Sequence, residues 1–217
     1  MSGGVAAASS TASAWVDTAT ATYVSAVSFT VAGDSTGVIP IGAKYRYKQG
    51  GSYEYGSVIT TSYSDPNTTI TLATNDDYAM ANAAITDSAW SSENCPVGHP
   101  LWYGWTPTLT GFSANPTSTM YRFMVEGRLC TVAVNQLETT GTSNAGTFTI
   151  TGPITARTVT NGRWGSKPWY GANNGVYTAN LSAYISTGSA TINLIIPGSS
   201  WTASGTKNIS FVMTYEI

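Results

Sequence analysis

The sequence predicts an all-β protein, made of a small N-terminal β barrel or sandwich, a short helical linker and a C-terminal jelly-roll-like β-sandwich. Charged residues are only 9% of the 217 residues, against about 25% in an average soluble domain. Thr and Ser together supply 59 residues, and Thr, Gly and Tyr are poor or middling helix formers. The aromatic share of 12% favours a packed core over disorder. The shortage of charge excludes a coiled coil.

Residues 1–14 form a leader of small residues, which we expect to be a flexible tail or a docking segment. The leader lacks the basic and apolar regions of a secretory signal peptide. No run in the chain approaches the roughly 20 apolar residues of a membrane helix. An extended segment of this kind can thread into a partner protein. Its expected docking residues are Ser2, Gly3, Gly4 and Val5.

Residues 15–74 are expected to form the small β module, because short strands alternate with turn signals. Residues 23–31 alternate as one strand. Residues 44–48 place two tyrosines on one face and three cations on the other, which predicts a half-exposed strand. Residues 49–52 then close a hairpin, and residues 65–67 make a further turn.

Residues 75–104 are predicted to hold a helix and the linker between the two modules. The helix, expected at residues 75–90, has an alanine-rich centre, and its first residues can cap it. Residues 91–103 are interpreted as the linker. Trp102 and Trp105 are expected to be buried between the modules.

Residues 105–217 are expected to form the second module, a jelly-roll-like β-sandwich. Eight short strands of even length, separated by Gly, Pro and Asn turns, are typical of that fold. The strands are expected at residues 106–110, 120–126, 128–137, 147–150, 157–160, 176–185, 190–196 and 209–216.

The charge balance offers no field that would attract nucleic acid or an anionic membrane. The formal net charge is −2 and the isoelectric point is about 5.2. Residues 1–100 hold three basic and eight acidic side chains, a balance of −5, whereas residues 101–217 hold six and three, a balance of +3. The asymmetry supports two modules, and we expect neither nucleic-acid binding nor membrane insertion.

The sequence contains no recognisable catalytic or cofactor motif. No G-x-S-x-G elbow accompanies the single histidine, His99, and no glycine-rich phosphate loop is found. Glycosidases need two flanking carboxylates, but Glu126, Glu138 and Glu216 stand at a turn, a strand end and the terminus. We therefore expect a protein without enzymatic activity, metal or cofactor.

Three further groups have simple structural interpretations. Cys95 and Cys130 are expected to be unpaired thiols, with a disulfide as the alternative, and two cysteines with one histidine cannot complete a four-ligand zinc site. Cys130 alternates with valines and is interpreted as a core residue. Asp76 and Asp77 could contact calcium, but a helix start explains the pair more simply.

Residues 161–170, with the sequence NGRWGSKPWY, are the candidate contact segment and are expected to form a loop. Aromatic faces beside cationic donors suit the stacking of sugar rings. The same grouping suits a subunit interface, where Trp, Tyr and Arg are enriched. Both interpretations remain open. The candidate glycan or subunit contacts are Arg163, Trp164, Lys167, Trp169 and Tyr170, with Asn173 or Asn174 as further donors.

Stretches of both modules resemble structural proteins of tailed bacteriophages. The N-terminal stretches are TYVSA at 22–26, SFTVAGD at 28–34, PIG at 40–42, YGSV at 55–58 and TTIT at 68–71. They resemble a small β module that recurs in tail-fibre and tail-tip proteins. The second module, with WTPTLTG at 105–111, Tyr121, Gly127, the strand to Leu137 and ITGP at 150–153, is similar to the C-terminal jelly-roll domain of virion appendages.

The resemblance covers the chain from about Trp15 onwards and implies a structural protein of a virion, made in the bacterial cytoplasm and exposed on the particle. It implies a homotrimer formed by the second module, which often meets the host surface. The N-terminal part would bind other tail or capsid proteins. No ligand-binding motif is shared, so no functional residue is carried over. A capsid-bound head fibre or decoration protein and a secreted carbohydrate-binding module remain as alternatives.

Overall fold

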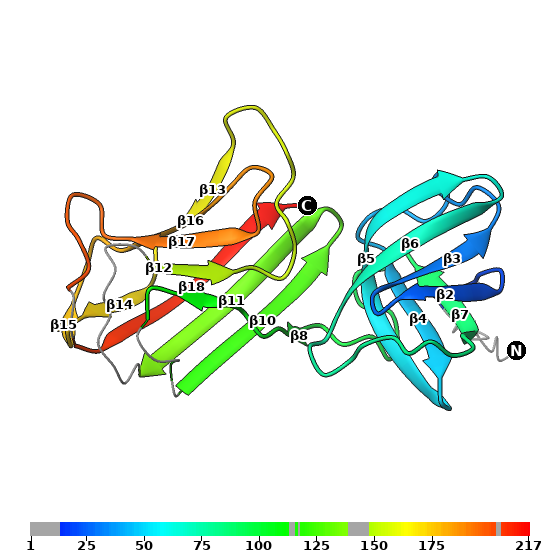
Figure 1. Cartoon of the computed structure of the whole chain (residues 1–217), viewed down its shortest axis with the longest axis horizontal. Coiled ribbons are helices and arrows are strands. Elements are labelled where there is room, and N and C mark those ends of the chain that lie inside the picture. The colour runs from blue at the N-terminus through cyan, green and yellow to red at the C-terminus, as the bar shows by residue number, and fades with distance from the viewer. Residues whose placement is uncertain (1–13, 113–115, 117, 139–147, 203–204) are drawn as a thin grey trace, which may run out of the picture.

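The computed structural model describes residues 14–112, 116, 118–138, 148–202 and 205–217. These residues form antiparallel β-sheets and no helix, so the predicted all-β class is confirmed. Figure 1 shows two bodies of strands joined by an extended segment. The predicted docking residues Ser2, Gly3, Gly4 and Val5 lie outside the described residues. Within the described ranges, no helix is long and apolar enough to cross a membrane.

The first module is one curled sheet, sheet A, of seven strands (Figure 1). Its strands are β1 (Val16–Asp17), β2 (Ala21–Ser25), β3 (Ser28–Ala32), β4 (Lys44–Gln49), β5 (Ser52–Ser64), β6 (Asn67–Thr74) and β7 (Thr86–Ser91). They follow the order β1-β7-β4-β5-β6-β3-β2. Tyr45 and Tyr47 are fully buried inside the curl beside Phe29, as the alternation of β4 predicts.

Two predictions for the first module are wrong. Residues 23–31 form the hairpin of β2 and β3, which turns at Ala26 and Val27 because the Ser25 and Ser28 hydroxyls hydrogen-bond across it at 2.6 Å. The helix predicted at residues 75–90 is absent, and so is the short helical linker. Its last residues form β7, which pairs with β4 and β1 and extends sheet A.

The side chain of Gln49 explains part of the missing helix. Its amide nitrogen donates to the carbonyls of Ala81 at 2.8 Å and Ala83 at 3.1 Å, and its oxygen accepts from the amide of Ala81 at 2.9 Å. These bonds satisfy backbone groups that a helix would otherwise pair internally. Tertiary contacts therefore override the local helix propensity of the alanines.

The second module contains two sheets. Sheet B consists of β8 (Tyr103–Gly104), β10 (Ser118–Glu126), β11 (Leu129–Glu138), β14 (Tyr170–Asn173), β15 (Val176–Tyr177) and β18 (Lys207–Glu216). Sheet C consists of β9 (Leu109–Thr110), β12 (Phe148–Thr151), β13 (Arg163–Ser166), β16 (Ser182–Ser186) and β17 (Thr191–Ile195). Their orders are β15-β14-β18-β11-β10-β8 and β13-β16-β17-β12-β9. Both sheets contribute to one buried core, an arrangement consistent with a β-sandwich.

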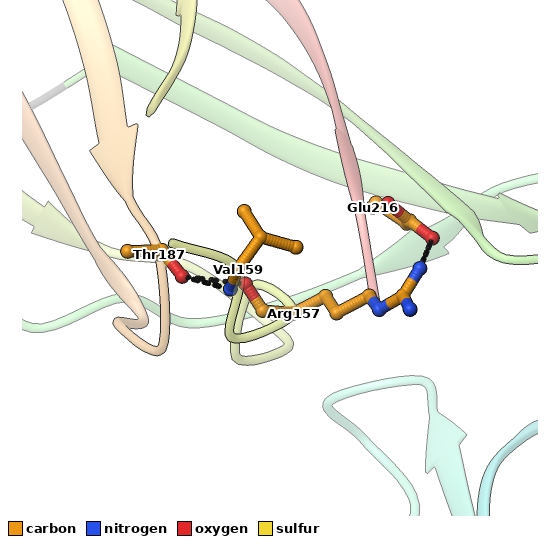
Figure 2. A network of polar contacts seen from close by, with 4 residues as sticks. All are labelled: Arg157, Val159, Thr187 and Glu216. Atoms are coloured by element: carbon orange, nitrogen blue, oxygen red, sulfur yellow. Dashed lines mark hydrogen bonds and ion pairs between the residues drawn. The ribbon is translucent and has the colours of Figure 1, made fainter. Parts of the chain in front are cut away.

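Residues 157–160 were predicted as a strand but form an irregular segment held by polar contacts (Figure 2). The Arg157 guanidinium pairs with the Glu216 carboxylate at the end of β18. The Thr187 hydroxyl accepts from the amide of Val159 and donates to the carbonyl of Arg157. The strand predicted at residues 176–185 is also interrupted, because β15 belongs to sheet B and β16 to sheet C.

The two modules touch through a close approach of their backbones. Gly42 has a φ of 87°, and a Cβ added there would overlap the carbonyl oxygen of Gly127, in the turn between β10 and β11. Ile41 and Ile59 of the first module pack against the core of the second. We call this contact region the module junction.

Lys44 crosses the module junction. Its exposed fraction is only 3%, although the alternation of β4 predicts an exposed cation. The ammonium group donates to the hydroxyl of Ser57 at 3.3 Å and to the backbone carbonyl of Val125 in β10. Burial lowers the pKa of Lys44 to about 8. The hairpin of the second module therefore covers a side chain that sheet A alone would leave in water.

Replacing Gly42 with alanine should destabilise the protein much more than replacing Gly33, because only Gly42 meets another backbone. Both residues have φ near 80–90° (82° for Gly33 and 87° for Gly42), but an added Cβ at Gly33 has nothing within 4 Å. Gly33→Ala should lower the free energy of unfolding by about 1 kcal/mol through backbone strain alone. Gly42→Ala should cost about 2–3 kcal/mol more. Urea unfolding curves measure the difference, and equal costs would mean that the junction is not closed in solution.

The stability should also depend on the protonation of Lys44. Its pKa falls from 10.5 to about 8 on folding, so the unfolded chain binds more protons between these pH values and the free energy of unfolding rises with pH in that window. Burial raises the pKa of Tyr45 and Tyr47 above that of the unfolded chain, where tyrosines titrate near pH 10, so the comparison is with Lys44→Met, which keeps them. Urea unfolding at pH 8 and 10 should give a more positive pH dependence for the native protein than for the variant. Identical pH dependence would exclude a buried Lys44.

Candidate functional site

The candidate contact segment crosses from one sheet of the second module to the other. Sequence reasoning predicts a loop at residues 161–170, but the segment contains the edge strand β13 of sheet C and the first residue of β14 of sheet B. The Ser166 hydroxyl donates to the backbone carbonyl of Val212 at 2.6 Å, which fixes the crossing. The rings of the segment are thus held by regular structure on both sides.

The structure separates the three aromatic residues of the segment. Trp164 lies opposite the fully buried Ile185 and packs, partly buried, against the core of the second module. Trp169 is 67% exposed and Tyr170 is 38% exposed. Trp169 and Tyr170 therefore face solvent, while Trp164 contributes mainly to packing.

The two cations of the segment are exposed. The Arg163 guanidinium lies 4.9 Å from the ring centroid of Tyr184, a cation–π contact on sheet C. Lys167 lies between β13 and β14, two residues before Trp169. Asn173 is partly used inside the chain, because its side-chain oxygen accepts from the amide and hydroxyl of Thr202 at 3.1 and 2.8 Å.

The structure adds two exposed residues that sequence reasoning missed. Val176 is 67% and Tyr177 is 62% exposed, and both belong to β15, the edge strand of sheet B. The rings of Tyr177 and Tyr170 lie 6.1 Å apart. We call Trp169, Tyr170, Val176 and Tyr177 the aromatic edge. Figure 1 shows β14 and β15 at the end of the second module that points away from sheet A.

A turn signal in the sequence could have identified the missing strand. Asn174 and Gly175 have φ values of 54° and 73°, which fit the tight turn between β14 and β15. An Asn-Gly pair is the strongest short-range signal of a two-residue hairpin. Interpreting residues 176–185 as one strand hid this hairpin, and with it the exposure of Val176 and Tyr177.

His99 has a structural place in the module junction. Its side chain is buried, and Nε2 lies 2.6 Å from the hydroxyl of Tyr103. Burial, together with the nearby charge of Lys44, lowers the pKa of His99 to about 4, so the ring is neutral at pH 7. The ring also contacts Trp15 and Tyr55.

The remaining candidate groups do not gather into one site. Cys95 is exposed and Cys130 is buried, and both are free thiols, as expected. Glu216 pairs with Arg157 (Figure 2). Trp105 is buried in the second module, whereas Trp102 is half-buried under the guanidinium of Arg122. Across the described ranges, no group of three or more His, Cys, Asp or Glu side chains is placed to hold a metal ion.

Comparison of the chain with known protein families, curated proteins and solved structures found no match.

The exposed and half-buried tryptophans of the segment should respond differently to truncation. Trp164→Ala removes a ring packed against the core and should lower the free energy of unfolding by about 2–4 kcal/mol. Trp169→Ala should change it by less than about 0.5 kcal/mol, because the ring is largely in solvent. Chemical denaturation at low protein concentration, where association does not contribute, measures both values. A large loss for Trp169→Ala would show that its ring supports the fold rather than a contact.

Proposed function

We propose that the protein is a non-enzymatic structural protein of a phage virion, a trimeric fibre or tail-tip component whose outer contact surface is the aromatic edge. The observation that carries this proposal is the exposure of four large side chains on β14, on β15 and at the residue before β14, with Trp169 and Val176 each 67% exposed and the rings of Tyr170 and Tyr177 6.1 Å apart. Large exposed apolar side chains gathered at one end of a molecule often mark an interaction site. The assignment to a virion rests on the resemblance of both modules to phage appendage proteins.

The edge strand β15 supports the proposed self-association. Among the described strands, none pairs with the outer side of β15, and unpaired strand edges invite association unless another chain covers them. A closed trimer of the second module covers three such edges at once. The low charge of the chain reduces the cost of removing charged groups from water at such an interface. The jelly-roll form of the second module is part of this proposal.

A glycan contact at the same surface is the second candidate. The neighbouring rings of Tyr170 and Tyr177 offer stacking faces, and Lys167 offers a charged donor on the same segment. In either case the N-terminal leader would attach the protein to the particle, since the aromatic edge lies at the opposite end of the second module from sheet A (Figure 1). A head fibre or decoration protein would use the same arrangement on the capsid.

Light scattering of the purified protein at micromolar concentration should give a mass of three chains, that is, three times 22.7 kDa. Tyr177→Lys should shift the mass towards a single chain, because it places a charge on the aromatic edge. Tyr63→Lys is the matched control: Tyr63 is 41% exposed but belongs to sheet A, so the trimer should persist. A single-chain mass for the native protein would overturn the trimer.

Particles produced by the phage genome that encodes this chain test the assignment to a virion. Mass spectrometry of purified particles should detect the protein, and antibody labelling followed by electron microscopy should place it on a tail or a capsid. Absence of the protein from particles would overturn the assignment. If the protein is found on particles but is not a trimer, the assignment to a virion stands and only the proposed trimer is rejected.

A further inference from the structure

A furrow follows the module junction. A hollow of about 460 Å³ lies between the modules, and a second of about 380 Å³ shares Asp76, Trp105 and Thr106 with it. A third, of about 250 Å³, shares Asn75 and Tyr78 with the first. Ligand sites of this size occur preferentially where two domains meet. Figure 1 shows β8, which precedes Trp105, between the two bodies.

The lining of the furrow combines aromatic rings with hydrogen-bond acceptors. Tyr78, Trp102 and Trp105 line its three hollows, together with the hydroxyls of Thr106 and Thr108. Three carboxylates also line it, from Glu54, Asp76 and Asp77. Among the residues that the structure describes, no Lys, Arg or His side chain lines the three hollows, and the nearest cation noted above, Arg122, lies over the Trp102 ring at 5.4 Å from its centroid. The furrow therefore differs from the candidate contact segment, which carries Arg163 and Lys167.

The segment at residues 75–78 is fixed across the junction. The Asn75 side-chain oxygen accepts from the amide of Gly104 at 2.6 Å, and the amide of Asp76 donates to the carbonyl of Gly104 at 3.2 Å. The Thr106 hydroxyl donates to Asp76 Oδ2 at 2.9 Å. These bonds hold the Asp76 carboxylate at the furrow in one position, where it retains capacity to accept further hydrogen bonds.

Two more carboxylates lie at the end of the furrow. Burial, with the neighbouring charge of Asp77, raises the pKa of the Glu54 carboxyl. The side-chain amide nitrogen of Asn75 donates to Asp77 Oδ1 at 2.5 Å. Tyr55 and Tyr78 line the same hollow. Hydrogen-bond acceptors and aromatic side chains therefore line the third hollow as well as the two that Asp76 lines.

We propose that the furrow at the module junction binds a neutral oligosaccharide, with its sugar rings against the aromatic side chains and its hydroxyls donating to Asp76 and the neighbouring acceptors. Sugars present an apolar C–H face and a rim of hydroxyl donors, which matches rings flanked by carboxylates and threonines. An anionic sugar or a phosphate would meet carboxylates without a lining cation. The proposal is independent of the trimer and of the aromatic edge.

A glycan array with neutral and sialylated oligosaccharides, probed with the full-length protein, tests this proposal. We expect neutral glycans to bind. Sialylated glycans that expose no stretch of uncharged sugars should not bind. Binders are then titrated by calorimetry against two variants. Thr108→Trp fills the furrow from an exposed position, and Asp76→Ala removes the central acceptor. Each should weaken binding by about tenfold or more.

The matched control is Thr110→Trp, because Thr110 is also exposed, lies two residues from Thr108 and lines none of the three hollows. Thr110→Trp and Trp169→Ala should bind as the native protein does, and melting temperatures should stay unchanged in Thr108→Trp. Binding that survives Thr108→Trp and Asp76→Ala would overturn the proposal. Binding of sialylated glycans alone, or of no glycan on the array, would overturn it as well.

Discussion

The buried ammonium group of Lys44 is the contact on which the arrangement of the two modules depends. Lys44 is the first residue of β4, and a lysine there would normally extend its amine into water, but the β10–β11 hairpin covers it and supplies the carbonyl of Val125. Removing a charge from water costs free energy unless hydrogen bonds replace the lost hydration. The junction therefore has to close in one register, with Val125 over Lys44, or leave the amine without its acceptor.

The glycine pair at the junction imposes the same register by a steric constraint. Gly42 and Gly127 come so close that a side chain at Gly42 would overlap the backbone carbonyl of Gly127. His99 and Tyr103 fill the space beside this contact and are mutually hydrogen-bonded. The hydrogen bonds of the buried Lys44 and the close approach of Gly42 to Gly127 are separate physical requirements. The same arrangement of the two modules meets both.

The alternation of apolar and polar residues along a strand predicted which side chains of that strand are buried within its own sheet. The burial of Tyr45 and Tyr47 follows from the pattern of β4, and the hairpin from β4 to β5 follows from its glycines. The same pattern placed Lys44 in water, because the covering carbonyl of Val125 lies 81 positions later in the chain. The helix predicted for the alanine-rich stretch is absent for a similar reason: Gln49 binds backbone groups of Ala81 and Ala83, and the residues that follow pair with β4 as β7.

The sequence predicted which residues make up the candidate contact segment, but not which of their side chains point into the core and which into solvent. The grouping of rings and cations at residues 161–170 identified an unusual surface, yet only pairing with β16 sends Trp164 inwards while Trp169 stays exposed. The junction furrow had no sequence signature, because Asp76 and Trp105 become neighbours only when the modules close.

The two surfaces depend on different parts of the structure. The aromatic edge is formed within sheet B of the second module, so it persists whatever the position of sheet A. The furrow takes one wall from each module and exists only while the junction contacts, among them Lys44 with Val125 and Asp76 with Thr106, hold the modules together. Carboxylates line the furrow, whereas the cation Lys167 lies two residues before Trp169, so a charged ligand favoured at one surface is disfavoured at the other. Contacts at the aromatic edge and in the furrow are therefore physically separable on one chain.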